Sequence, residues 1–229
     1  DGATVSSAVL REGAALTAPA DPTKTGFAFD GWALEGQSTA YDFTSATVTA
    51  DMTFTALWAP SIESAVVSEA EVVTGYSGTD LTNAGTVTTA DSFAIDVSDV
   101  QGDIAGTLLS VRVDGQVYEN VSYDSGIITV TADLPVTLFG YKTYVAQFEN
   151  AGQKTYVSGE ILFITMKIGS EADLRAFYQI GHAAYPDQGN RTGGYFVLDA
   201  NISWTAETGY AVPEHIFQGT FDGRGYAID

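Results

Sequence analysis

The sequence predicts a mainly β protein built from several modules, and three observations point to it. The chain has 229 residues, about one and a half times a typical domain length, so two or three modules fit better than one. Only 17% of residues are charged, below the roughly 25% of ordinary soluble domains, and Thr, Ser, Gly and Val are abundant. Apolar residues also alternate with polar ones in short segments, which favours strands joined by tight turns.

Residues 1–60 contain the first strand and turn signals. Pro22 and Gly26 bracket a turn in the segment PTKTGFAFDGW (22–32), and Asp30-Gly31 is a typical tight-turn pair. The segment 41–58 then alternates apolar residues with Thr and Asp, which predicts a half-buried strand. The apolar members of that alternation are Val48, Met52, Phe54, Ala56 and Trp58.

The same residues resemble the Listeria–Bacteroides repeat, also called the internalin B-type repeat. The matching stretches are Pro22, Gly26–Trp32, Tyr41–Phe43 and Ala56–Trp58, which together span most of residues 5–60. The resemblance implies a small β-grasp-like fold, found in tandem on bacterial surface proteins, with a role in spacing or weak adhesion. A module of about 55 residues has little area to bury, so Trp32 and Trp58 are expected in its core. An exposed binding platform is the alternative.

Residues 61–166 are predicted to form a second module, an immunoglobulin-like or fibronectin III-like β-sandwich. Pro60 is expected to end the first module, and the strand candidates that follow have the spacing of an all-β sandwich. Tight turns separate several of them, including Asp114-Gly115. Alternation places Tyr144, Ala146 and Phe148 on one face of a strand. The strand candidates are 65–74, 92–97, 107–113, 116–121, 127–132, 141–149 and 153–166.

One acidic cluster of this module is a candidate calcium site. The segment 91–106 places Asp96, Asp99 and Asp103, with Asp91 before them, near a glycine-containing loop. Calcium binds six to eight oxygen ligands and favours loops rich in carboxylates. The spacing does not fit an EF-hand loop, and solvated turn residues are the alternative interpretation. No other metal and no organic cofactor is expected.

Lys142 and Lys154 lie on predicted strands of the same module. By analogy with pilin domains, each is a candidate for an isopeptide crosslink to an Asn or Asp side chain. Such a bond also needs a catalytic carboxylate nearby, and an exposed lysine on an edge strand is the ordinary interpretation.

Residues 167–229 are predicted to begin a third module with a capped helix. Ser170 and Asp173 form a capping-box-like pair at the start of the helix, and Leu174, Phe177 and Tyr178 share one face. The two segments that follow, 195–202 and 217–228, resemble the start of the right-handed β-helix regions of bacterial surface proteins, including those with GLUG-type repeats. The resemblance implies the first strands of a β-solenoid, truncated here, in a protein that continues beyond Asp229.

Composition excludes several classes of function. The chain has 9 basic and 29 acidic residues and a net charge of −20, so nucleic acid is not expected as a partner. No apolar stretch is long enough to span a bilayer. No cysteine is present, which excludes disulfides and thiol catalysis.

No catalytic residue stands out. The two histidines, His182 and His215, lie outside any G-x-S-x-G or H-E-x-x-H setting. Asp222, in FDGRG, suits a turn better than a catalytic role. We therefore predict a protein that is not an enzyme.

The sequence as a whole predicts a fragment of an extracellular bacterial cell-surface protein. The predicted role is that of an adhesin or a stalk, with a host surface protein or a glycan as the partner; the oligomeric state is left open. The alternative is the accessory N-terminal region of a carbohydrate-active enzyme whose catalytic β-helix lies downstream.

Overall fold

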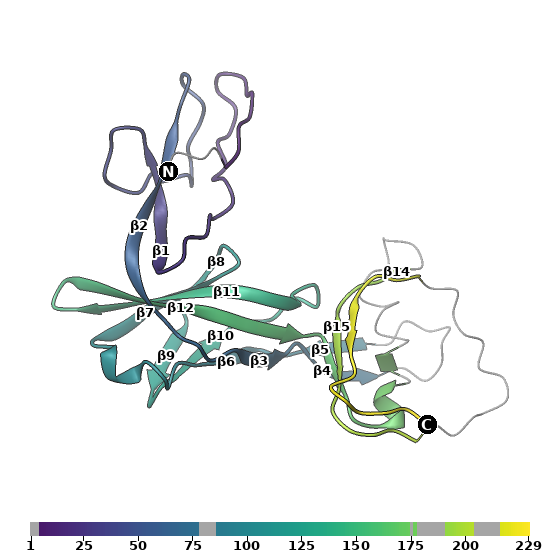
Figure 1. Ribbon diagram of the computed structural model, residues 1–229. Helices are drawn as coiled ribbons and strands as arrows, with labels where there is room; N and C mark the ends of the chain where they lie inside the picture. The colour runs from purple at the N-terminus through teal and green to yellow at the C-terminus, as the bar shows by residue number, and fades with distance from the viewer. Residues whose placement is uncertain (1–4, 78–85, 175, 178–190, 204–215) are drawn as a thin grey trace.

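Strands dominate the structure of this chain. A computed structural model describes residues 5–77, 86–174, 176–177, 191–203 and 216–229. Strands account for 49% of it and helices for 5%, which confirms the predicted mainly β class. Figure 1 shows a first unit standing on a middle unit, and a C-terminal unit at the far end of the middle unit's long strands.

The first unit is built around the antiparallel pair β1 (Phe27–Leu34) and β2 (Phe54–Glu63). The predicted tight turn at Asp30-Gly31 is wrong, because β1 runs through both residues. They form a bulge, at which the register shifts between Phe29 and Gly31. Both a tight turn and this bulge need a residue that accepts a positive φ, and Gly31 has a φ of 116°.

Aromatic side chains fill the interior of the first unit. Trp32 is 7% exposed, and its indole N–H donates to the Pro19 carbonyl oxygen at 3.2 Å. Phe29 meets Trp32 and Trp58 edge to face, with ring centroids 5.4 and 5.9 Å away. The predicted core position is therefore confirmed for Trp32, whereas Trp58 is half-buried.

Strand β2 does not stop at Pro60, where the first module was expected to end. It continues to Glu63 and there pairs in parallel with β12 (Gln153–Ile164) of the middle unit. Ser61 N–H donates to the Gly26 carbonyl at 3.1 Å. Since successive N–H groups of a strand point to opposite sides, the N–H that Pro60 lacks would point away from β1. One sheet therefore runs from the first unit into the middle unit.

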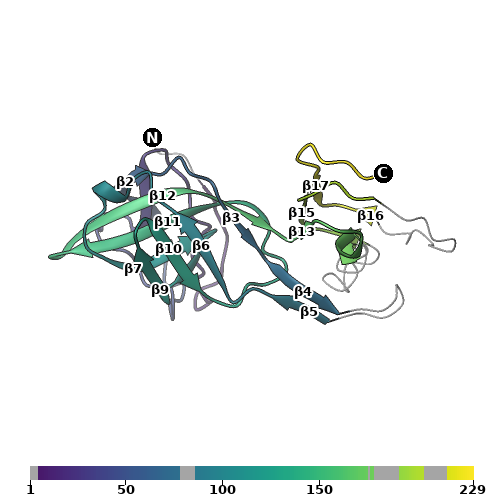
Figure 2. The same ribbon diagram turned by 90° about the horizontal axis from the view of Figure 1, so that it is seen from below.

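The middle unit consists of two sheets that face each other across one core. The larger sheet has the order β1-β2-β12-β11-β7-β8, with β3 also paired to β12, and curls into a half-barrel. The smaller sheet has the order β6-β10-β9 and lies below the long strands β11 and β12 (Figures 1 and 2). The strands not yet bounded are β3 (Ser68–Glu71), β6 (Ser92–Asp96), β7 (Thr107–Val113), β8 (Gln116–Tyr118), β9 (Val121–Asp124), β10 (Ile127–Thr131) and β11 (Gly140–Asn150).

The core between the two sheets confirms the predicted alternation. Tyr144, Ala146 and Phe148 of β11 are at most 1% exposed, and Ile128 and Val130 of β10 are fully buried. These residues belong to one cluster that contains side chains from both sheets. The face that each strand turns inward is therefore set by its own period-two pattern.

Tight turns join the strands of this unit. At Asp114-Gly115, Ser125-Gly126 and Ala151-Gly152, both residues have positive φ, which is the backbone of a type I′ hairpin turn. The predicted strand 116–121 is divided in the structure between β8 and β9. The hairpin of β4 (Val73–Ser77) and β5 (Thr86–Thr89) was not predicted.

The C-terminal unit is a stack of short parallel strands. Strand β15 (Tyr195–Leu198) lies between β13 (Met166–Ile168) and β17 (Thr220–Asp222), and β14 (Arg191–Thr192) pairs with β16 (Ile216–Phe217). Phe196 pairs with Phe221, 25 residues further along the chain. Ile202 likewise forms a parallel bridge with Ile228.

A short helix begins beside this stack, at residues 171–174 and 176–177. The predicted cap at Ser170 is confirmed, because Asp173 N–H donates to Ser170 Oγ at 3.2 Å. The Asp173 carboxylate accepts in return from Ser170 Oγ–H at 2.7 Å and from the Gly169 N–H at 3.2 Å. Leu174 is 6% exposed, and Phe177 meets Phe196 edge to face at 4.7 Å. Tyr178 lies outside the described residues.

The last layer of the stack is more exposed than the layer beneath it. Phe196 and Ile202 are at most 2% exposed, whereas their stacked partners Phe221 and Ile228 are 37% and 44% exposed. Phe217, at 40%, is exposed as well.

The buried hydroxyl of Tyr144 allows a test of the core. It has no hydrogen-bond partner among the described residues, and the nearby Ser64 hydroxyl donates to Asp99. Burial raises the pKa of Tyr144 from 10.0 to about 12. We expect Tyr144→Phe to change the free energy of unfolding by less than about 1 kcal/mol near pH 7, since no good hydrogen bond is lost.

The pH dependence of the same variant follows from linkage. Because the folded-state pKa is raised, Tyr144 contributes stability below pH 10 that is lost as the pH rises toward 12. Urea unfolding at pH 8 and pH 11 should therefore show a smaller loss for Tyr144→Phe than for the unaltered chain. A large loss of stability at pH 8 would mean that the hydroxyl is well bonded.

Candidate functional site

The acidic residues predicted to bind calcium serve other contacts. Asp99 receives two hydrogen bonds from the connector between β2 and β3, from Ser64 Oγ and from the Ala65 N–H, both at 2.8 Å. The carboxylate thus holds the place where the chain leaves one strand of the large sheet and enters the next. Ser64 itself is 5% exposed.

Asp96 and Asp103 do not take part in this contact with the connector. Asp96 accepts a hydrogen bond from the Ser98 N–H at 2.8 Å, and hydrogen bonding by Ser98 lowers the pKa of Asp96. Asp103 ends a short 3-10 helix, Gln101–Asp103, and is exposed. Within the described part of the chain, no three acidic or histidine side chains form a group that could hold a metal ion. The calcium site stays a prediction from the sequence.

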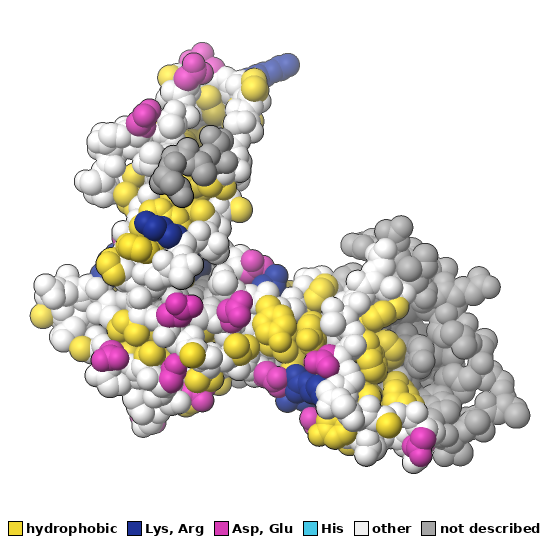
Figure 3. All heavy atoms as spheres, viewed as in Figure 1, with side chains coloured by type: hydrophobic (Ala, Val, Ile, Leu, Met, Phe, Trp, Pro, Cys, Tyr) yellow, Lys and Arg dark blue, Asp and Glu magenta, His cyan; other side chains and the backbone are white. Residues whose placement is uncertain are grey.

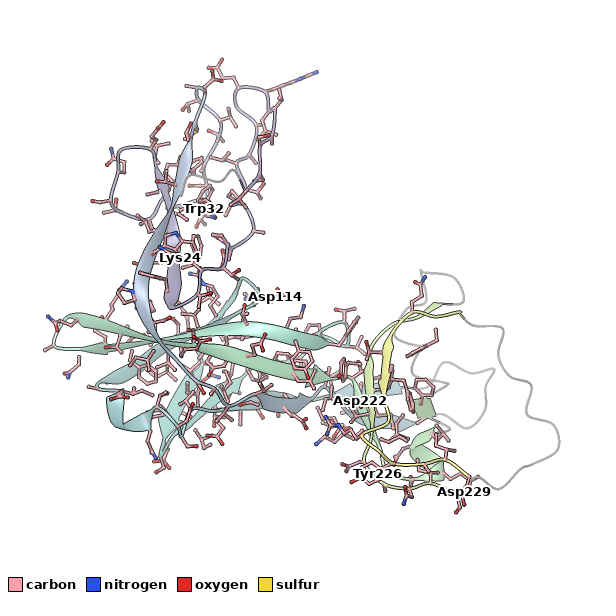
Figure 4. All side chains as sticks on the ribbon, in the orientation of Figure 1. Lys24, Trp32, Asp114, Asp222, Tyr226 and Asp229 are labelled. Atoms are coloured by element: carbon pink, nitrogen blue, oxygen red, sulfur yellow. The ribbon has the colours of Figure 1, made fainter. Side chains whose placement is uncertain are left out.

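The two lysines considered for crosslinks form ion pairs. Lys142 Nζ lies 2.7 Å from Asp114 Oδ2, and Lys154 Nζ lies 3.7 Å from Asp30 Oδ1. Asp114 is labelled in Figure 4, in the turn after β7. Its side chain is 60% exposed, and an isopeptide bond is favoured by burial of both partners, so the ion pair is the interpretation that this geometry supports.

A cluster of polar contacts lies at the junction between the first and middle units. Tyr156 Oη donates to Asp30 Oδ1 at 2.6 Å, and burial followed by this hydrogen bond raises the pKa of Tyr156. Arg112 Nη1 lies 3.0 Å from Asp21 Oδ2, and the guanidinium is 5.6 Å from the ring centroid of Phe29. We call the contacts of Asp21 and Asp30 with Arg112 and Tyr156 the first junction.

This junction was not predicted from the sequence. Asp21 and Asp30 are far from Arg112 and Tyr156 in the sequence, and nothing in the local pattern links them. The one available signal was the scarcity of basic residues, 9 in 229, since each is worth tracing to a partner in so acidic a chain.

A second junction joins the middle unit to the C-terminal unit. Arg224 Nη2 donates to Glu69 Oε1 at 2.6 Å, and Lys167 Nζ lies 3.9 Å from Glu69 Oε2. The hydrogen bond to Glu69 is the main cause that raises the pKa of Arg224. Figure 3 shows basic and acidic side chains side by side at this place. We call the contacts of Glu69 with Lys167 and Arg224 the second junction.

Asp222 shapes the turn that presents Arg224. Its Oδ1 accepts a hydrogen bond from the Arg224 N–H at 3.0 Å, and Arg224 has a positive φ of 47°. The predicted turn role of Asp222 is therefore confirmed. Figure 4 places Asp222 beside the long strands of the middle unit, with Tyr226 and Asp229 further along the same edge.

The histidines predicted to lack a catalytic setting, His182 and His215, lie outside the described residues. Among the residues that are described, no helix is long and apolar enough to cross a membrane. The contacts of the two junctions connect the units of the chain to one another.

The Asp99 contacts provide a test that separates structure from metal binding. We expect Asp99→Ala to destabilise the chain by about 1 kcal/mol, because Ser64 Oγ–H and Ala65 N–H lose their acceptor. Asp103→Ala is the matched control and should stay within roughly 0.5 kcal/mol. The measurement is thermal unfolding of both variants with added calcium and with a chelator. A calcium-dependent midpoint that both substitutions abolish would instead support the metal site.

Comparison with known proteins identifies the first unit. The family model of the Listeria-Bacteroides repeat domain matches residues 1–57, the segment in which the sequence analysis noted the resemblance. This repeat occurs in bacterial surface proteins. No curated protein matches the chain. The match covers the first unit, whose strand β2 begins inside the matched segment and ends in the sheet of the middle unit.

Proposed function

We propose that this chain is a non-catalytic, extracellular part of a bacterial cell-surface protein, and that it acts as a stiff stalk or spacer. The observation that carries the proposal is the continuity of β2, which belongs to the first unit at Phe54 and to the sheet of the middle unit at Glu63. Modules that share a strand have no free linker between them, so they hold a fixed mutual orientation.

The strand order of the middle unit supports an immunoglobulin-like module. Strands β6, β10 and β9 would correspond to B, E and D of that fold, and β7, β11 and β12 to C, F and G. Strand β3, which precedes β6, pairs in parallel with β12. Modules of this kind are common in cell-surface proteins and serve as spacers as well as binding domains.

The parallel stack at the C-terminal end supports the start of a β-solenoid. The pairing of Phe196 with Phe221 and the bridge between Ile202 and Ile228 show layers repeated after about 25 residues. Repeats of such length, each burying its apolar side chains against its neighbour, are typical of solenoids. An elongated solenoid on a stiff base would suit a protein that extends away from a cell.

A spacing role fits the aromatic residues of the first unit better than adhesion does. Trp32 is buried, and Phe29 bridges it to Trp58 through ring contacts. Lys24 covers Phe27, with Nζ 3.9 Å from the ring centroid; Lys24 and Trp32 are labelled in Figure 4. Rings used in this way hold the unit together and leave little flat surface for a sugar or a peptide.

The fixed orientation of the first two units can be measured with spin labels. Because the chain has no cysteine, Ser38→Cys and Glu119→Cys, both at exposed positions, give one label on each unit. We expect a single narrow distance distribution by pulsed electron paramagnetic resonance. A broad distribution would contradict the proposed stiff spacer.

Substitution at the first junction should loosen this arrangement. Adding Arg112→Gln and Tyr156→Phe to the labelled chain removes the contacts with Asp21 and Asp30, and we expect the distribution to broaden. Lys142→Gln is the matched control, since it removes an ion pair within the middle unit; it should leave the distribution unchanged.

A binding screen separates spacing from adhesion. The spacer proposal predicts no signal when the chain is tested against a glycan array and a panel of host matrix proteins. A saturable signal that Trp58→Ala abolishes, while the chain stays folded, would assign adhesion to the first unit instead.

A further inference from the structure

We propose that the middle unit is a load-bearing clamp, in which tension between the two ends of the chain shears one parallel seam. The seam consists of Ser61–Glu63 and Ser68–Glu71 on one side, and Tyr156–Ser158 and Ile161–Ile164 on the other. The proposal extends the spacing role by assigning a mechanical function to one set of strand pairs.

The direction of the strands determines how the seam meets a load. The chain enters the middle unit through β2 and β3 and leaves it through β12, and both pairs are parallel. Tension therefore pulls β2 and β3 backward along their axis and β12 forward along the same axis. In this geometry the hydrogen bonds of the seam are strained together, and none can break alone at an end.

Further hydrogen bonds join the two sides of the seam between its two stretches and beyond the second one. Ser64 N–H donates to the Ser158 carbonyl at 2.8 Å between the two stretches, where Asp99 holds the connector. Past the second stretch, Val72 N–H donates to the Ile164 carbonyl at 2.8 Å and Val73 N–H to the Thr165 carbonyl at 2.9 Å.

Burial protects the seam from water, which would otherwise replace its strained hydrogen bonds. Val157, Ile161 and Ile164 of β12 are fully buried, as is Val72 on the opposite side. Breaking the seam therefore exposes apolar core surface at the same moment as it breaks hydrogen bonds. This coupling favours a slow forced unfolding rate.

The first unit meets the same load in the opposite geometry. Its strands β1 and β2 are antiparallel, so Phe27, where tension enters β1, lies beside Pro60, where tension leaves β2. The contact of Ala15 with Thr47 is also antiparallel. Tension therefore opens these pairs one at a time from a single end, and the first unit should yield before the middle unit.

Single-molecule force spectroscopy of the whole chain tests the clamp. With handles at the two termini, the first unit should extend at low force and add on the order of 200 Å for about 56 residues. The middle unit should then open at a clearly higher force. Opening of the middle unit before the first unit would overturn the proposal.

A change of pulling direction isolates the seam itself. Gln153 is exposed and begins β12, so Gln153→Cys provides a place to attach a handle. That handle pulls on β12 from the end of the seam where Ser61 pairs with Tyr156. We expect the opening force of the middle unit to fall roughly twofold or more, because the same hydrogen bonds now break in turn. Equal forces in both directions would show that the seam is not the clamp.

A crosslink gives an independent control. The hydroxyl oxygens of Ser61 and Ser158 lie 3.0 Å apart across the seam, so Ser61→Cys with Ser158→Cys should form a disulfide, which a thiol assay can verify. The oxidised chain should lose roughly 340 Å of extension, since the 97 residue steps from position 61 to position 158 stay closed at about 3.5 Å each. Reduction should restore it. The crosslink should also abolish the high-force opening of the middle unit, because the seam can no longer separate; a high-force opening that persists in the verified oxidised chain would place the clamp outside the seam. These forces are independent of the label distances, so a failed clamp leaves the proposed spacing role standing.

Discussion

The pairing of β12 along both of its edges is the constraint on which the rest of the structure depends. On one edge β12 is antiparallel to β11 throughout its length, and on the other it is parallel first to β2 and then to β3. The strand thereby connects the first unit, the core of the middle unit and, through β13, the C-terminal stack. A buried backbone N–H or C=O group without a hydrogen-bond partner is costly. The buried strand β12 therefore needs a paired strand on each edge, and β11, β2 and β3 provide that pairing.

Electrostatics complements this arrangement in an unusual way for so acidic a chain. With 9 basic against 29 acidic residues, repulsion between units is the expected default. Yet the basic side chains of Arg112 and Lys154 face acidic residues of the first unit, and Lys167 and Arg224 face Glu69. Each pair is partly exposed and contributes at most about 1 kcal/mol. Their combined effect is to remove local repulsion where two units meet.

Mechanical behaviour follows from topology more than from composition. The first and middle units use similar strands and similar aromatic residues, but their loaded strands are antiparallel in one and parallel in the other. The number of hydrogen bonds matters less than whether they are strained together or in sequence. A spacer that combines the two geometries has one unit that extends under load and one that resists it.

Local patterns determined most of the secondary structure. The alternation of Tyr144, Ala146 and Phe148, the turn at Asp114-Gly115 and the Ser170–Asp173 cap could all be predicted, because each depends on residues close together in the sequence. Asp30-Gly31 shows the limit of this reasoning, since glycine permits a turn and a bulge equally. Only the partner strand β2 decides between them.

Tertiary structure alone decided which units are joined and how. The sequence placed a boundary at Pro60 because proline often ends a strand, but the N–H that Pro60 lacks would point away from β1, so β2 keeps its pairing and continues. The contacts of Asp30 with Tyr156 and of Glu69 with Arg224 span more than a hundred residues, and no local pattern encodes such pairs. The sequence by itself therefore determined the mainly β class of this protein and the repeat in its first unit. The folded chain determined that its units share a sheet, because strand pairing is a property of neighbours in space.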